Sequence, residues 1–243
     1  MYNARTNIFF LTDISLQKRI LIEKLRCKFS IPCNGLAIAF DNRDYPEFQN
    51  EKWRSDGLHI NIEKGDMELE QQEGVPNSVA FIIESKNYAN LIWITHKCCI
   101  ESDAQFTGLM SHELQHYMQD RISYTLSQIN GFMLNYFLKL FEPKTKMDIP
   151  YEFDAELKAF KIVKEWFGIE EAKAYIIKGE NKKLLGKFLN YNFDISYDLL
   201  NETILLYEKY RDQLLKYSET EQFYLDDKIQ KIKKMIRPLM VYF

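Results

Sequence analysis

The pattern of apolar residues changes near residue 102, and this change limits what the chain can fold into. Before it, short apolar runs separated by polar stretches are typical of strands. Four runs are predicted to be strands: residues 35–40, 58–62, 79–83 and 90–95. A helix is predicted to precede them, capped by Thr12 or Asp13 and ending before Pro32.

From residue 102 onward, apolar residues recur at the three- and four-residue spacing of amphipathic helices. A first helix is predicted from a cap at Ser102 or Asp103 to about residue 122, and a second over residues 129–141. A third is predicted at Pro150–Phe167, because proline suits the first turn of a helix. A small N-terminal sheet followed by a largely helical C-terminal half predicts an α+β fold.

The length of 243 residues fits one domain with a helical extension. We predict a domain over residues 1–167, with an N-terminal α/β part (1–100) and a helical part (102–167). Residues 168–243 are predicted to form helices packed on that domain. Glycine and proline are sparse, at 9 and 6 residues, which argues against a long flexible linker.

Charge and cysteine usage indicate the surroundings in which this chain works. A net charge of -3 does not favour nucleic acid as a partner. No apolar stretch is long enough to cross a bilayer, and the first residues do not resemble a signal peptide. The 4 cysteines do not form a disulfide framework. We therefore predict a cytoplasmic protein without nucleic-acid or membrane partners, and the sequence leaves the oligomeric state open.

Two of the 4 histidines fall in the run His-Glu-Leu-Gln-His at residues 112–116. On a helix, His112 and His116 lie one turn apart on the same face, where two imidazoles can bind one zinc ion. Glu113 lies about 100° around the helix from His112, so its carboxylate can reach a water on the metal without binding the metal itself. A carboxylate base beside a metal-activated water is the arrangement that attacks a carbonyl. The run predicts a metal-dependent hydrolase.

A catalytic zinc ion needs a third protein ligand, and the helix predicted at Pro150–Phe167 offers two candidates. Glu152 and Glu156 lie on its inner face among apolar residues, where unpaired carboxylates would be costly. A zinc site would satisfy both, one as a ligand and the other by holding the ring N–H of a histidine. Asp154 is an alternative ligand, but its place on the charged face of the helix argues against it.

The motif at 112–116, followed by a helix with Glu-x-x-Ala at 152–155, resembles the gluzincin metallopeptidases. It is similar to the compact peptidases of the ImmA/IrrE type and to related peptidases of phages and mobile elements. The resemblance covers about residues 90–167. It implies His112, His116 and Glu152 as zinc ligands and Glu113 as the general base.

The same resemblance implies that Glu156 orients the first histidine. It also implies a zincin-like fold in which an edge strand, here residues 91–95, comes just before the motif helix. An extended peptide substrate would pair with that edge strand. Donors to the tetrahedral intermediate are only weakly indicated, and the candidates are Tyr151, Tyr136 and His96.

The leading functional prediction is a zinc-dependent peptidase that acts on a peptide or protein substrate. Two alternatives stay open: a catalytically inactive, zinc-stabilised module that binds a protein, and a metal-dependent hydrolase of a non-peptide amide. Glu113 favours catalysis, because a structural zinc site needs no base. Cys98 and Cys99 could cover the metal as thiolates, but buried, inert cysteines are the favoured interpretation.

Overall fold

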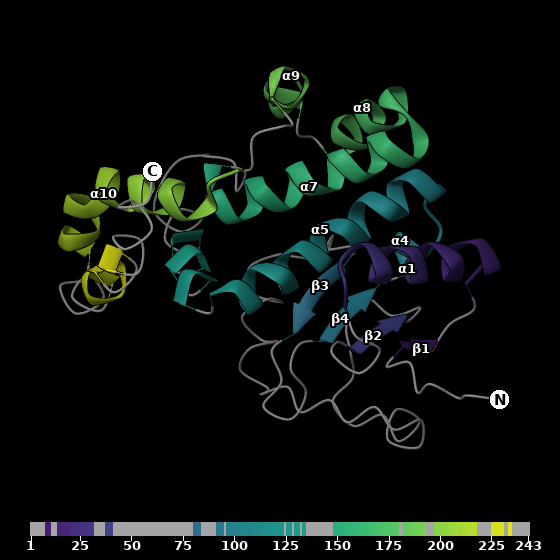
Figure 1. Cartoon of the computed structure of the whole chain (residues 1–243), viewed down its shortest axis with the longest axis horizontal. Helices are drawn as coiled ribbons and strands as arrows, with labels where there is room; N and C mark the ends of the chain where they lie inside the picture. Colours follow the sequence, from purple (N-terminus) through teal and green to yellow (C-terminus); the bar gives the residue numbers. More distant parts are fainter. Residues whose placement is uncertain are drawn as a thin grey trace. The chain divides into compact units, whose positions relative to one another are not determined.

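The structure of the protein is a computed structural model (Figure 1). It describes residues 8–10, 14–31, 37–40, 80–83, 91–94, 96–123, 125–127, 129–131, 133–134, 148–179, 182–192, 197–217, 225–230 and 233–234.

Four short strands form one sheet in the order β1-β2-β4-β3. The strands are β1 (Ile8–Phe10), β2 (Ala37–Phe40), β3 (Ala80–Ile83) and β4 (Leu91–Ile94). β2 pairs in parallel with β1 and β4, whereas β3 and β4 are antiparallel. The last three strands lie within predicted runs, β1 was not predicted, and the predicted strand at 58–62 lies outside the described residues.

The predicted fold class was wrong. Helices dominate the described residues and no described strand exceeds 4 residues, so this part of the chain is predominantly helical. β4 pairs with β2 on one side and β3 on the other, so it is not the edge strand that a zincin-like fold implies. The four apolar residues Leu91–Ile94 suit an inner strand, because such a strand is covered on both faces.

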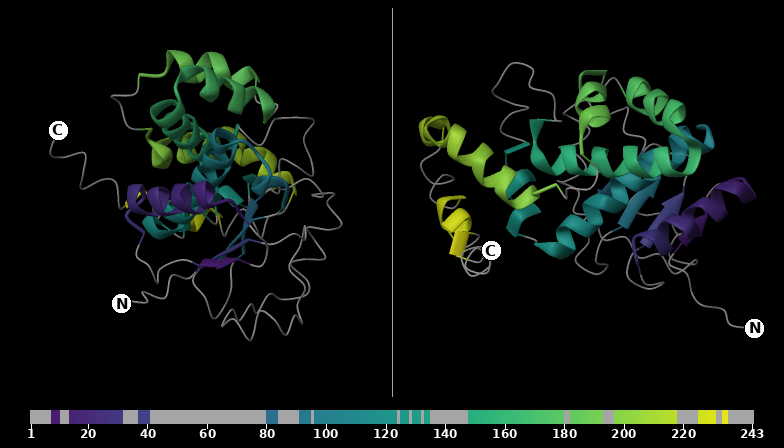
Figure 2. Two further views of the ribbon diagram at one scale, coloured as in Figure 1. Left: turned by 90° about the vertical axis from the view of Figure 1, so that its right-hand side faces the viewer. Right: turned by 45° about the horizontal axis from the view of Figure 1, so that its top comes forward.

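By its internal contacts, the chain divides into two compact units, and each is described by itself. One unit comprises residues 1–117 and 158–188, and the other comprises residues 118–157 and 189–243. Two long helices, α5 (Asp103–Ile122) and α7 (Pro150–Phe167), each contribute residues to both units. Figures 1 and 2 show each of them as one unbroken ribbon. The predicted domain boundary after residue 167 stays a prediction.

In the first unit, α1 (Leu16–Lys28) begins at Ser15, whose hydroxyl accepts a hydrogen bond from the Lys18 amide at 3.3 Å. Ser15 is therefore the cap, in place of the predicted Thr12 or Asp13. α1 contacts α5 through Lys18, which pairs with Asp103 at 3.8 Å and lies over the Phe106 ring. Leu21, Ile22 and Leu25 of α1 are buried, as are Ile38 and Ile92 of the sheet.

α5 begins where the sequence predicted, because the Ser102 hydroxyl accepts a hydrogen bond from the Gln105 amide at 3.3 Å. It follows the short helix α4 (His96–Cys99). In the first unit, α7 is followed by α8 (Ile169–Lys178) and α9 (Lys182–Asn190). Gly108 of α5 lies against α8: a Cβ placed there would come within 2.4 Å of the Tyr175 ring. This glycine therefore permits close packing of the two helices.

The second unit has its own apolar core, built on α10 (Leu199–Tyr217) and three stretches of chain that pack with it. The buried members are Leu126, Ile129, Met133, Ile149, Ile204, Tyr207, Tyr210, Leu225 and Ile229. Residues 225–230 and 233–234 are helical and are held to α10 by polar contacts as well.

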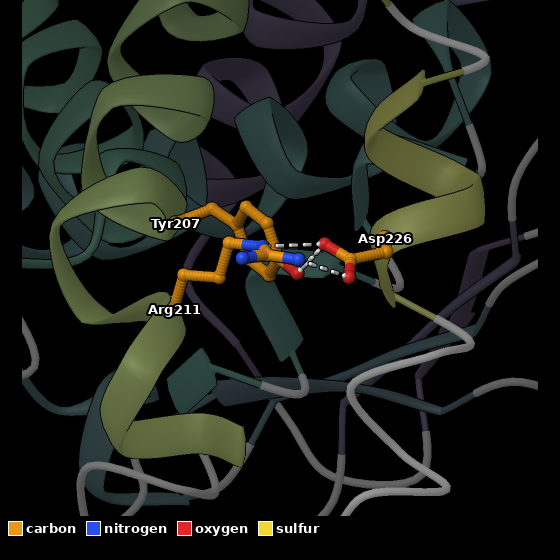
Figure 3. A network of polar contacts seen from close by, with 3 residues as sticks. All are labelled: Tyr207, Arg211 and Asp226. Carbon is orange, nitrogen blue, oxygen red and sulfur yellow. Dashed lines mark hydrogen bonds and ion pairs between the residues drawn. The ribbon is translucent and has the colours of Figure 1, made fainter.

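One of these contacts is a cluster of three residues, shown in Figure 3. Tyr207 and Arg211 of α10 both point to Asp226. The Tyr207 hydroxyl and the Arg211 Nε donate to Asp226 Oδ1, the latter at 3.0 Å, and Arg211 Nη2 donates to Oδ2 at 2.9 Å. Lys233 pairs with Glu208 nearby along the same two segments.

Among the described helices, none has the length and hydropathy that a membrane span needs.

Candidate metal centre

α5 brings His112 and His116 together on one face. The two rings meet edge to face, with centroids 4.6 Å apart and an angle of 86° between their planes. Their Nε2 atoms are 3.0 Å apart, and the residues are only 9% and 7% exposed. The two Nε2 atoms therefore lie side by side where little water reaches them.

α7 supplies a third residue to the same place. Glu152 lies in the first turn of this helix and is 5% exposed. His112, His116 and Glu152 each offer one ligand atom, and these atoms all lie within 4.8 Å of one another. A buried carboxylate is costly unless cations or donors surround it. This buried group can hold a metal ion.

The donor set and the spacing fit zinc. Zinc binds histidine nitrogen at about 2.0–2.1 Å, so two tetrahedral ligands are separated by about 3.3 Å. The observed 3.0 Å between the two Nε2 atoms is close to that value. A hydrogen bond between the rings would give a similar distance, since one imidazole can donate to the other. Imidazole and carboxylate also bind other transition metals, so the residues alone do not identify the metal.

The resemblance implied two further carboxylates at the site. Glu113 is half-buried on α5. Its charge contributes, after burial and the neighbouring Cys99, to a Cys98 thiol pKa well above the ordinary value. Glu156 lies one turn after Glu152 on α7 and is 4% exposed. The roles of Glu113 as the base and of Glu156 as the partner of a histidine stay predictions.

The structure describes the suggested proton donors unequally. The Tyr151 hydroxyl donates to Asp120 Oδ1 at 3.2 Å, and burial raises the pKa of Tyr151 well above its ordinary value. Tyr136 lies outside the described residues. His96 is the first residue of α4. None of the three is assigned a role.

Asp154 was expected on the charged face of α7, and it is more exposed than Glu152 and Glu156 of the inner face. It is half-buried, and its Oδ2 accepts a hydrogen bond from Gln119 Nε2 at 2.7 Å. Sequence reasoning missed Gln119 as part of the site's surroundings. Its spacing, three residues after His116 and seven after His112, places it on the same face of α5, but this spacing does not show that it contacts α7.

Both cysteines before α5 are buried and free of disulfides. Burial raises the pKa of Cys99 to about 11, and burial is also the main cause of the raised pKa of Cys98. Both thiols are therefore protonated at neutral pH, which is consistent with inert packing residues.

Comparison with protein-family models, with curated proteins and with solved structures gave no match for this chain. The chain has a buried His112–His116–Glu152 group with the His-x-x-x-His spacing on a helix and a glutamate downstream.

Proposed function

We propose that this protein is a zinc-dependent peptidase, with His112, His116 and Glu152 as the metal ligands and Glu113 as the general base. One observation carries the proposal: three buried residues from α5 and α7 offer ligand atoms within 4.8 Å of one another. Two neutral imidazoles and one carboxylate are a common ligand set of catalytic zinc.

Catalysis is favoured over a structural role by the number of ligands. A structural zinc site is closed by four protein ligands, whereas a catalytic site keeps one position open. In the described part of the chain, the group comprises three metal-binding residues and no fourth. A bound zinc ion would lower the pKa of a water and polarise a carbonyl group.

Glu113 supports hydrolysis in particular. It follows His112 on α5, so its carboxylate leaves the helix about 100° from the imidazole. In that direction it does not serve as a third ligand of the same metal ion. A carboxylate in that place accepts a proton from the attacking water and passes it to the leaving nitrogen. A peptide is proposed as the substrate because of the gluzincin resemblance, and a non-peptide amide is the alternative.

Metal content is the first test. Protein purified without chelators and dialysed after zinc addition should hold about one zinc ion per chain, measured by elemental analysis. Glu152→Gln should lose most of it. Glu165→Gln is the matched control, because Glu165 is an exposed glutamate on the same helix that pairs with Lys28. A wild-type protein without zinc would overturn the proposal.

Hydrolysis is the second test, measured by mass spectrometry on a mixture of unstructured peptides. Glu113→Gln should keep its zinc and lose about 10²- to 10⁴-fold in rate, because the water loses its base. Zinc binding by the wild type without cleavage of any peptide would refute the peptidase. Cleavage of simple amide substrates alone would then identify the non-peptide hydrolase, and no cleavage would favour the binding module.

A further inference from the structure

Gln119 is completely buried on α5, one turn beyond His116. Its Nε2 donates two hydrogen bonds to α7: one to the carbonyl oxygen of Tyr151 at 2.9 Å and one to Asp154 Oδ2 at 2.7 Å. A primary amide nitrogen has two hydrogens, so these two acceptors use its full donor capacity. A buried amide without such acceptors would be destabilising, so the pairing fixes the local packing of the two helices.

The two acceptors lie on either side of Glu152 in the sequence. Tyr151 comes immediately before it and Asp154 two residues after it, all among the first five residues of α7. Gln119 therefore holds the one helical turn that carries the third ligand. Because α5 is continuous, the same helix that carries the two histidines also sets the position of that turn.

A second buried amide supports the same turn from another direction. Asn130 is completely buried, and its Oδ1 accepts a hydrogen bond from the Tyr151 amide at 3.4 Å. The first amides of a helix have no partner within the helix, so this contact satisfies one of them. Asn130 Nδ2 donates to the Leu126 carbonyl oxygen and to Thr203 Oγ1, both at 3.0 Å, and so connects the turn to α10.

We propose that Gln119 is a positioning residue for the metal centre: it sets the distance between the Glu152 carboxylate and the two histidines without touching the metal. This inference rests on the proposed function. A purely structural role for Gln119 would affect folding alone, whereas a positioning role also changes the affinity and the coordination of the metal. Partners of this kind typically change metal affinity or activity by about 10- to 100-fold.

The experiment compares Gln119→Leu with the wild type in three measurements. They are zinc affinity by competition with a chromophoric chelator, the visible spectrum of the cobalt-substituted protein, and the midpoint of thermal unfolding without metal. We expect zinc affinity to fall about 10- to 100-fold and the cobalt bands to shift, because Glu152 no longer meets the histidines at the same distance.

Tyr207→Phe is the matched control. It removes a buried side chain's hydrogen bond to Asp226 in the same unit, and that bond involves no residue of α7. It should lower the unfolding midpoint but leave zinc affinity and the cobalt spectrum unchanged. A general loss of stability is thereby separated from a change at the metal.

A second pair of variants keeps the test decisive if Gln119→Leu does not fold. Gln119→Glu alone places two carboxylates together, whereas Gln119→Glu with Asp154→Asn exchanges donor and acceptor and restores that bond. Zinc affinity should recover in part in the double variant. No recovery, or a folded Gln119→Leu with the zinc affinity and cobalt spectrum of the wild type, would overturn the positioning role and leave the zinc site intact. A wild type that binds no zinc would overturn the proposed function itself, and the positioning role with it.

Discussion

Two polar clusters in this protein contrast sharply in their surroundings. His112, His116 and Glu152 are all buried, whereas Arg211 and Asp226 of the other cluster keep 49% and 30% of their side chains exposed. The exposed pair makes its own hydrogen bonds, and because solvent screens its charges it contributes little to stability. In the buried group, where water is scarce, an incomplete set of partners is costly.

This contrast suggests different uses for similar residue types. Removal of a charge pair on the surface changes the free energy of unfolding only slightly. A buried group of two imidazoles and a carboxylate is stabilised when a metal ion binds to all three, and the proposed zinc ion has this role. Four measurements test the contrast, from the largest expected effect to the smallest.

Removal of the metal should have the largest effect. A ligand that binds only the folded state stabilises it by about 4 kcal/mol when its free concentration is 1,000 times its Kd. Thermal unfolding of the wild type should therefore shift strongly between excess zinc and excess chelator. His116→Ala should show no such shift, and an equal shift in both proteins would place the zinc elsewhere.

Glu156→Ala should have the next largest effect. If its carboxylate accepts the ring N–H of His112, its loss weakens zinc binding by about 10- to 100-fold, a smaller loss than that of Glu152→Ala. Glu156→Gln, which keeps an acceptor oxygen, should lie between the wild type and Glu156→Ala. Unchanged zinc affinity in Glu156→Ala would show that this residue is not a partner of the histidines.

Tyr207→Phe should cost less, because a typical hydrogen bond contributes about 0.5–1.5 kcal/mol. The ring stays in its buried place, so only the bond to Asp226 is lost. Urea unfolding should report this loss, with the slope of the transition unchanged. A loss several times larger would mean that the exposed cluster supports more of the second unit than its surroundings indicate.

The pH dependence of the exposed cluster should be the smallest effect. The hydrogen bond from Arg211 holds the pKa of Asp226 below its usual value. The stabilisation is therefore present above the unfolded-state pKa, near 3.9, and is lost as pH falls through the lower folded-state pKa. The difference in unfolding free energy between the wild type and Asp226→Asn should shrink as pH falls from 5 to 2. A difference that grew towards acid would contradict this sign.

The sequence predicted the three residues of the buried His112–His116–Glu152 group because their signals are local. His112 and His116 are neighbours on one turn, and the helix that carries Glu152 has the bounds that its first proline and its apolar pattern predicted, Pro150–Phe167. Gln119 was missed because its importance depends on which part of α7 packs against α5. That pairing joins residues more than thirty positions apart, and spacing along the chain does not reveal it.

The arrangement of the strands was harder to predict for a related reason. The apolar run of β4 indicated a strand, but it did not show which strands pair with it. In the structure these are β2 and β3. The family resemblance assigned it to an edge, and the hydrophobicity of Leu91–Ile94 on both faces was the better guide. β1 has only 3 residues, too few for an alternating pattern to be recognised.

The spacing of residues along α5 sets several contacts of this protein. Gly108, His112, His116 and Gln119 lie along one face, so the packing against α8, the candidate metal site and the contact with Tyr151 all depend on spacing within a single helix. One residue inserted between His116 and Gln119 would turn everything after it by about 100° and move it by about 1.5 Å. A single substitution in this helix would therefore affect one of these contacts, whereas a change in its length would disrupt several of them at once.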